Sequence, residues 1–227
     1  MLRSKHGRTR SGLSLILLAL LAAGCENRAT SRQPAAQPTV GQTLASATPA
    51  TDIGLPPWKG DAAMERRLGS YQTVAGYEIR PPKDYRKKEL AEPGPLNVQV
   101  HWVGTPRADK SRPQLTVFLL ELANTKEKPE HLLQALFIPR GPDTRQTAYE
   151  SGQIGGLQFQ RVGWRGTRSL TGRQGAQVTE KQQGVSYVGR DGKIYIVINF
   201  QDSATHNDEY VETAKLMAAA IATFRKK

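Results

Sequence analysis

The stretch from Val185 to Phe200 constrains the fold most, because it contains two strand-like runs joined by a tight turn. The turn, Arg190 to Lys193, includes Asp-Gly, which suits a backbone that needs positive φ. The second run alternates, with Ile194, Ile196, Ile198 and Phe200 on one face and Tyr195 and Val197 on the other. The pattern therefore predicts an antiparallel β-hairpin.

Other segments also have the two-residue period of strands. Residues 113–122 are apolar on both faces, which predicts a central strand covered on both sides. In 157–164 the apolar positions change phase near Arg161, and a bulge or a strand buried on both faces accounts for this. Two shorter strands are expected, one at Tyr77–Ile79 and one in which Val98, Val100 and Trp102 share a face. The charged turn between them (83–89) is expected to be a solvated loop.

Two segments have helical spacing. Residues 129–138 begin with proline and carry Leu132, Leu133, Leu136 and Phe137 on one face. The chain closes with a helix capped by Thr205 or Asn207, whose apolar stripe is Tyr210, Ala214, Met217, Ile221 and Phe224. A short helix is also expected at 62–68. The order of elements favours an α+β domain with a mostly antiparallel sheet flanked by helices.

The N-terminal residues predict export. Four cations precede an apolar run, Leu13 to Leu21, that is too short to span a bilayer. The next residues, up to Gly24-Cys25, resemble the lipobox of bacterial lipoproteins, although the position three before the cysteine is Ala22 where the motif usually has Leu. That resemblance implies cleavage before a lipid-modified Cys25, the only cysteine of the chain.

The expected organisation is a signal peptide (1–24), a lipid-anchored disordered tether (25–60) and one α+β domain (61–227). Residues 26–51 are rich in Ala, Thr, Gln, Ser and Pro, so they cannot bury enough apolar area to offset the entropy of ordering. Hydrophobicity rises around Ile53 to Trp58, which can be the first piece to dock onto the domain.

The chain of 227 residues has a formal charge of +12, and the four cations before Cys25 leave +8 on the remainder. A basic envelope protein suits anionic phospholipid, lipopolysaccharide phosphate or acidic glycan as a ligand, and a basic surface without a dedicated ligand is the alternative. Export makes nucleic acid a poor choice of partner.

Two blocks indicate a family. The segment Gly76 to Pro82, and the hairpin with a closing helix that ends Ala222-Thr223-Phe224, together resemble the PsbP-like superfamily, over residues 71–224. The resemblance implies an α-β-α sandwich used mainly for binding and assembly. It carries no functional residue onto this chain.

No motif points to catalysis, a cofactor or a metal. The serine-hydrolase signature G-x-S-x-G is missing after Cys25, and His101, His131 and His206 lack paired metal-ligand spacing. We therefore expect a protein that is not an enzyme and that has no cofactor.

One stretch, Arg161 to Gly175, can carry function. It alternates glycines with four arginines, and arginine donates forked hydrogen bonds to phosphate or carboxylate. The usual role of glycine in turns favours a basic hairpin loop, and an anion-binding loop is the alternative. Its candidate residues are Arg161, Arg165, Arg168 and Arg173.

The first functional hypothesis is a lipid-anchored, non-catalytic envelope module that binds a protein partner or supports an assembly. The second is a binder of anionic envelope lipid or glycan through the arginine loop. The third is an enzyme whose site has no sequence motif.

Overall fold

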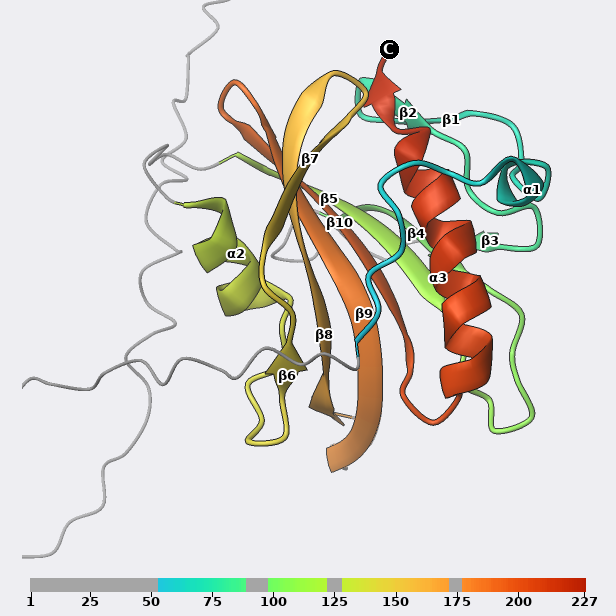
Figure 1. Cartoon of the computed structure of the whole chain (residues 1–227), viewed down its shortest axis with the longest axis vertical. Coiled ribbons are helices and arrows are strands. Elements are labelled where there is room, and N and C mark those ends of the chain that lie inside the picture. The colour runs from blue at the N-terminus through green and yellow to red at the C-terminus, as the bar shows by residue number, and fades with distance from the viewer. Residues whose placement is uncertain (1–52, 89–97, 122–127, 172–176) are drawn as a thin grey trace, which may run out of the picture. The chain divides into compact units, whose positions relative to one another are not determined.

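The computed structural model describes residues 53–88, 98–121, 128–171 and 177–227. The described strands form a large antiparallel sheet in the order β3-β4-β5-β10-β9-β8-β6, with β7 also paired to β8 (Figure 1). Its strands are β3 (Arg86–Lys88), β4 (Val98–Val103), β5 (Gln114–Glu121), β6 (Arg145–Gln146), β7 (Glu150–Ile154), β8 (Leu157–Thr171), β9 (Gln177–Asp191) and β10 (Ile194–Ser203).

The predicted hairpin is the centre of this sheet. Strands β9 and β10 pair from Asp191↔Ile194 to Gln182↔Ser203, and Gly192 in the turn has φ 62°. Strand β5 lies beside β10 and is buried on both faces, as its apolar run predicted. The hairpin and its neighbour therefore separate two layers of core.

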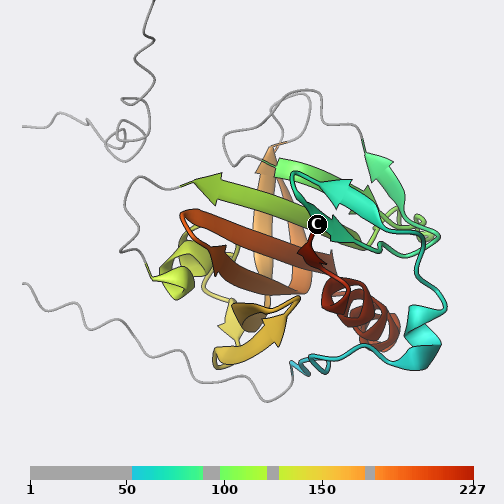
Figure 2. The same ribbon diagram turned by 90° about the horizontal axis from the view of Figure 1, so that it is seen from above.

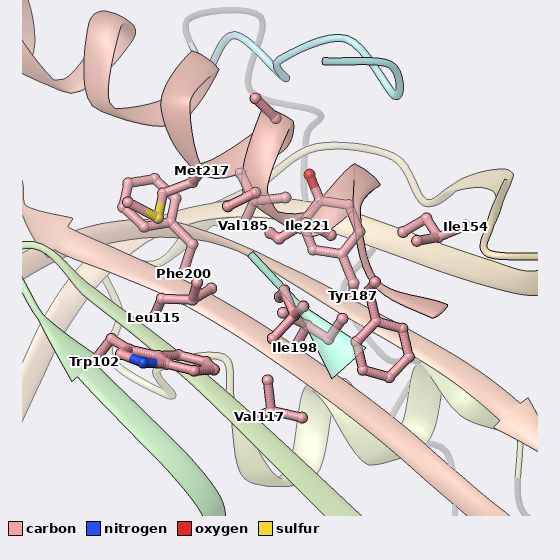
Figure 3. Close-up of a cluster of buried hydrophobic side chains, with 14 of the residues drawn as sticks. Trp102, Leu115, Val117, Ile154, Val185, Tyr187, Ile198, Phe200, Met217 and Ile221 are labelled. Atoms are coloured by element: carbon pink, nitrogen blue, oxygen red, sulfur yellow. The ribbon is translucent and has the colours of Figure 1, made fainter. Parts of the chain in front are cut away.

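The long helix α3 (Asn207–Ala222) covers one face of the sheet, here called the α3 face (Figures 1 and 2). All of its expected stripe is buried, because these side chains pack on the alternating apolar residues of β5, β9 and β10. Figure 3 shows this core, in which Met217 and Ile221 lie over Phe200, Val185 and Ile198.

The short helix α2 (Pro129–Leu136) covers part of the opposite face, here called the α2 face (Figure 2). Leu132, Leu133 and Phe137 pack there on a second core cluster that includes Trp164 and Tyr195. The fold is therefore α+β, with a mostly antiparallel sheet and a helix on each face, as expected. Among the described residues no helix is long and apolar enough to cross a membrane.

A small sheet and a short helix complete the domain. Strands β1 (Gln72–Val74), β2 (Tyr77–Ile79) and β11 (Arg225–Lys226) form an antiparallel sheet. Helix α1 (Ala62–Glu65) begins at Asp61, whose side chain accepts a hydrogen bond from the Ala63 amide at 2.7 Å.

The segment 53–60, here called the strap, packs against the domain. Ile53 and Pro56 are buried, and the Trp58 ring lies so close to Gly152 that a Cβ there would sit 2.5 Å from Trp58 Cδ2. A domain boundary at residue 61 is thus too late, because apolar strap residues complete the core on the α3 face.

Three local expectations are corrected. A register shift in β4 between Val98 and Val100 puts Val98 against the α2-face cluster, while Val100 and Trp102 face α3. The charged turn at 83–89 contains strand β3, which pairs with β4. Helix α3 has His206 as its N-cap, with no side-chain capping bond.

Candidate ligand-binding groove

The four candidate arginines do not share one loop. Residues 161–171 belong to strand β8, which pairs in unbroken register with β9, so the expected loop is wrong for this part of the chain. Successive side chains of a strand point to opposite faces of the sheet, so Arg161 and Arg165 lie on the α3 face and Arg168 lies on the α2 face. Arg173 lies outside the described residues. The phase change near Arg161 reflects a strand buried on both faces.

Arg161 is 4% exposed and holds the strap. Its Nη2 donates to Glu150 Oε2 at 2.7 Å and its Nη1 donates to the Pro56 carbonyl oxygen at 2.6 Å. Its Cζ lies 4.2 Å from the ring centroid of Trp58. These contacts compensate the burial of the guanidinium, so it is committed to a structural role.

Arg165 fastens β8 to the start of α3. Its Nη2 donates to Gln183 Oε1 and to Asn207 Oδ1, both at 2.7 Å. A planar guanidinium suits such bridging because its donors point in fixed directions.

Arg168 lies between α2 and the uncovered part of the α2 face. Its Nη2 donates to the Phe137 carbonyl oxygen at 2.8 Å, its Nη1 is 3.5 Å from Gln201 Oε1, and its Cζ is 5.8 Å from the Trp164 ring centroid. Burial lowers the pKa of this guanidinium. None of the three described arginines lines the groove that follows, and Arg168 is connected to it only through Gln201.

Helix α2 leaves one end of its sheet face open, and that end is polar. A groove with a volume of about 1160 Å³ lies there, here called the polar groove. It is lined by β3, β4, the ends of β5, β9 and β10, and the loop 104–112. The site is therefore built from the sheet surface, a rigid support for side chains.

A chain of hydrogen bonds runs from the core to this groove. Trp164 Nε1 donates to Ser186 Oγ at 2.9 Å, and Ser186 Oγ donates to Asn199 Oδ1 at 2.7 Å. Asn199 Nδ2 donates to Gln201 Oε1 at 3.3 Å, and Gln201 Nε2 donates to Gln114 Oε1 at 3.2 Å. Gln114 and Gln201 line the groove, so the network fixes their side chains in place.

His101 extends the polar surface toward the edge strand. Its Nδ1 is 3.0 Å from Thr116 Oγ1, and it pairs in register with Lys88 of β3. Burial, with a smaller contribution from the charge of Lys88, lowers the pKa of His101, which favours the neutral imidazole.

Cations gather on the rim. In register, Arg86 and Lys88 point to the groove face of β3, and Lys110 and Arg112 come from the loop 104–112. All four are exposed, and none forms an ion pair with another described residue. The rim therefore attracts negative charge.

The acidic groups that line the groove have hydrogen-bond or ion-pair partners among the described residues, with the exception of Asp84. Asp202 is buried and accepts from Arg107 Nη1 at 2.5 Å and Nη2 at 2.8 Å. Asp109 Oδ2 is 2.8 Å from His206 Nε2, and hydrogen bonds from Ser111 and His206 lower its pKa. These pairs also tie the loop 104–112 to β10 and α3.

Two residues that line the groove, Ser111 and Gln182, each have a buried side-chain oxygen without a hydrogen-bond partner among the described residues, and that of Gln182 can only accept. The side chain of Gln182 is 7% exposed, its Nε2 donates to Glu180 Oε2 at 3.1 Å, and its Oε1 has no partner there. An unsatisfied buried acceptor costs about 1–3 kcal/mol, so a site that retains one favours a ligand that donates.

The three histidines lie apart, in the groove (His101), on α2 (His131) and before α3 (His206). Within the described ranges, no cluster of three or more His, Cys, Asp or Glu side chains is arranged to hold a metal ion. Cys25 lies outside those ranges.

Sequence reasoning missed the groove, although β10 contains a signal for it. Its side chains on the α2 face change from Tyr195 and Val197 to Asn199, Gln201 and Ser203, so the apolar cover must end midway along the strand. Pairing across strands then brings Gln114 and Gln182 beside them, which sequence alone does not specify.

Fold and groove define a class: an α+β protein whose antiparallel sheet has a helix on each face and a polar groove with a cationic rim. No family model and no curated protein sequence matches the chain. It is similar to the solved structure of PsbP from the cyanobacterium Synechocystis, with 13% identity, a TM-score of 0.44, and coverage of 70% of this chain and 92% of that chain.

Two further solved structures are similar. LpqN of Mycobacterium tuberculosis, involved in cell envelope biogenesis, has 13% identity, a TM-score of 0.46, and coverage of 69% of this chain and 84% of that chain. The Ran-binding protein Mog1p of Saccharomyces cerevisiae has 12% identity, a TM-score of 0.44, and coverage of 69% and 95%. Likeness at this level gives no argument about function, which must come from the residues of this chain.

Proposed function

We propose that the protein is a non-catalytic module of the bacterial cell envelope, anchored to a membrane by lipid on Cys25, that binds another envelope component through the polar groove. The single observation that carries the binding role is the open polar end of the α2 face, whose rim cations have no ion-pair partner among the described residues. The proposed location in the cell envelope is supported by the charged and apolar segments before Cys25. The proposed lipid anchor is also supported by the lack of any second cysteine in the sequence.

The groove suits ligand recognition because its hydrogen-bonding side chains are held in fixed positions. Its amides are held by the network that begins at Trp164, and a preorganised surface loses little entropy when a ligand binds. The exposed rim cations add attraction at long range, which raises the rate of encounter with an anionic partner.

A protein partner is the second candidate, favoured by one observation. Strand β3 is a three-residue edge strand that pairs only with β4 among the described strands. An extended segment of a partner can add to such an edge by main-chain hydrogen bonds, although exposed Lys side chains make edges less receptive.

None of the three described candidate arginines is part of this proposal, because none of them lines the polar groove. Arg161 and Arg165 lie on the α3 face in contacts that hold the strap and α3, so an anion site shared with Arg168 would need both faces of one sheet.

Photo-crosslinking in cells tests the proposal. In the test variant a photoreactive amino acid replaces Arg112, on the groove rim. In the matched control it replaces Lys215, on the exposed side of α3. We expect a specific adduct, on any class of molecule, from position 112 and none from position 215. Equal adducts, or none at position 112, would contradict binding through the groove.

A further inference from the structure

Building on the proposed function, we infer that the ligand of the polar groove is an anionic glycan, a sugar chain that carries phosphate or carboxylate groups. Three features of the groove, as formed by the described residues, together point to this class: cations without an ion-pair partner there, few apolar lining residues, and the Oε1 of Gln182 without a donor there.

The charge of the groove selects an anion. Arg86, Lys88, Lys110 and Arg112 contribute four positive charges without ion-pair partners among the described residues, whereas Asp109 and the other nearby acids are mostly paired. His101 remains neutral near neutral pH because its pKa is lowered, so it adds a polar contact without charge. Several cations spread along a groove match an extended chain with repeated charges better than a single ion.

The composition of the groove disfavours the other anionic ligands. Among the described lining residues, Val103 and Pro106 are the only apolar ones apart from glycine, and there is no Phe, Tyr or Trp. A lipid needs an apolar surface for its acyl chains, and protein interfaces depend on aromatic or other large anchors in pockets. A sugar chain needs hydrogen-bonding groups, which this surface provides.

Gln182 distinguishes a sugar from a simple anion. Phosphate or carboxylate oxygens accept hydrogen bonds and cannot satisfy Oε1 of Gln182, which is itself an acceptor. A hydroxyl group donates, so a chain that carries both hydroxyls and anionic groups satisfies the rim and Gln182 together.

Binding of defined probes to the full chain in neutral detergent tests the inference. The probes are oligogalacturonate for carboxylate, phosphomannan fragments for phosphate, a neutral maltooligosaccharide, oligoglutamate, and phosphatidylglycerol vesicles. We expect one of the two charged sugars to bind at least about tenfold more tightly than the neutral sugar, the peptide or the vesicles. Binding of neither charged sugar, or equal binding of oligoglutamate or vesicles, would overturn the inference.

Variants assign the binding to the groove. The double change Lys88→Gln with Arg112→Gln should weaken charged-sugar binding about tenfold, while Lys193→Gln with Lys215→Gln, which removes the same charge elsewhere, should weaken it far less. Gln182→Leu should weaken binding with little change in the melting temperature, because its Oε1 has no donor among the described residues and its Nε2 bonds only to Glu180, an exposed residue that water can solvate. Equal effects of the two double variants would place the ligand elsewhere. If position 112 crosslinks a molecule in cells but neither charged sugar binds, this inference fails and the proposed function stands.

Discussion

The guanidinium of Arg161 lies over the indole ring of Trp58, with Cζ 4.2 Å from the ring centroid. The two residues are far apart in sequence, and their contact joins the strap to β8. Trp58 also meets Tyr187 edge to face at 5.8 Å between ring centroids. The segment 53–60 is therefore attached to the α3 face of the domain by specific contacts.

The first prediction concerns this attachment. Trp58→Ala removes the ring from a buried guanidinium and opens space at Gly152, so we expect a loss of about 2–3 kcal/mol in the free energy of unfolding. For a domain of this size the melting temperature should fall by about 5–10 °C. Trp58→Phe keeps a ring and should cost clearly less. Identical melting of Trp58→Ala and the unchanged protein would mean that the strap does not stabilise the domain.

The second prediction tests the hydrogen-bond network. Ser186→Ala leaves the indole N–H of buried Trp164 and the Oδ1 of Asn199 without their shared partner. We expect a loss of about 1–3 kcal/mol, measured by urea denaturation. Ser151→Ala, at an exposed position of β7, is the control and should change the unfolding free energy little. A Ser186→Ala effect no larger than that of the control would argue against the network.

The third prediction is the loss of stability in alkali. Burial, with a hydrogen bond from its hydroxyl to Asp191 Oδ2 at 2.8 Å, raises the pKa of Tyr77 from 10.0 to about 12. In this window the folded state retains a proton that the unfolded state has released, so unfolding free energy falls as pH rises from about 10 to about 12. Burial also raises the pKa of Tyr85 and Tyr210, which acts in the same direction.

Urea denaturation at several alkaline pH values checks this, beside absorbance titration of the tyrosines. Tyr77→Phe should make the fall in stability shallower, since its site no longer titrates. A slope that is the same in Tyr77→Phe and the unchanged protein would show that Tyr77 is not coupled to folding.

The fourth prediction concerns the anchor. Cys25→Ser should abolish lipidation and release the protein from membranes, because a serine cannot form the thioether. Fractionation of cells measures the release, and mass spectrometry of the mature N-terminus measures the lipid. A mature unchanged protein that begins elsewhere with an unmodified amine would refute the lipoprotein assignment.

Elements whose pattern is local were predictable from sequence. The turn at Asp191-Gly192 identified the hairpin, and the two-sided apolar run identified β5 as a central strand. The stripe that includes Met217 and Ile221 gave the covered face of α3. In each case neighbouring residues along the chain determine both the conformation and the buried face.

Features that depend on long-range pairing were not predictable. The direction of Arg161 and Arg168 follows from β8 being a strand, whereas its glycines suggested a loop. The polar groove arises where five strands bring amides and cations side by side, and no single segment carries that pattern. The strap was visible only as a rise in hydrophobicity, because its binding partner Arg161 is more than a hundred residues away.

Amine footprinting in native membranes tests the binding role of the groove most directly. The protein is labelled with an amine-reactive reagent in intact membranes and again after purification in detergent, and each lysine is compared with itself. We predict that Lys88 and Lys110, on the groove rim, are protected in membranes, whereas Lys193 and Lys215, on exposed surfaces elsewhere, react equally in both states. Unchanged labelling of Lys88 and Lys110 between membranes and purified protein would contradict the account.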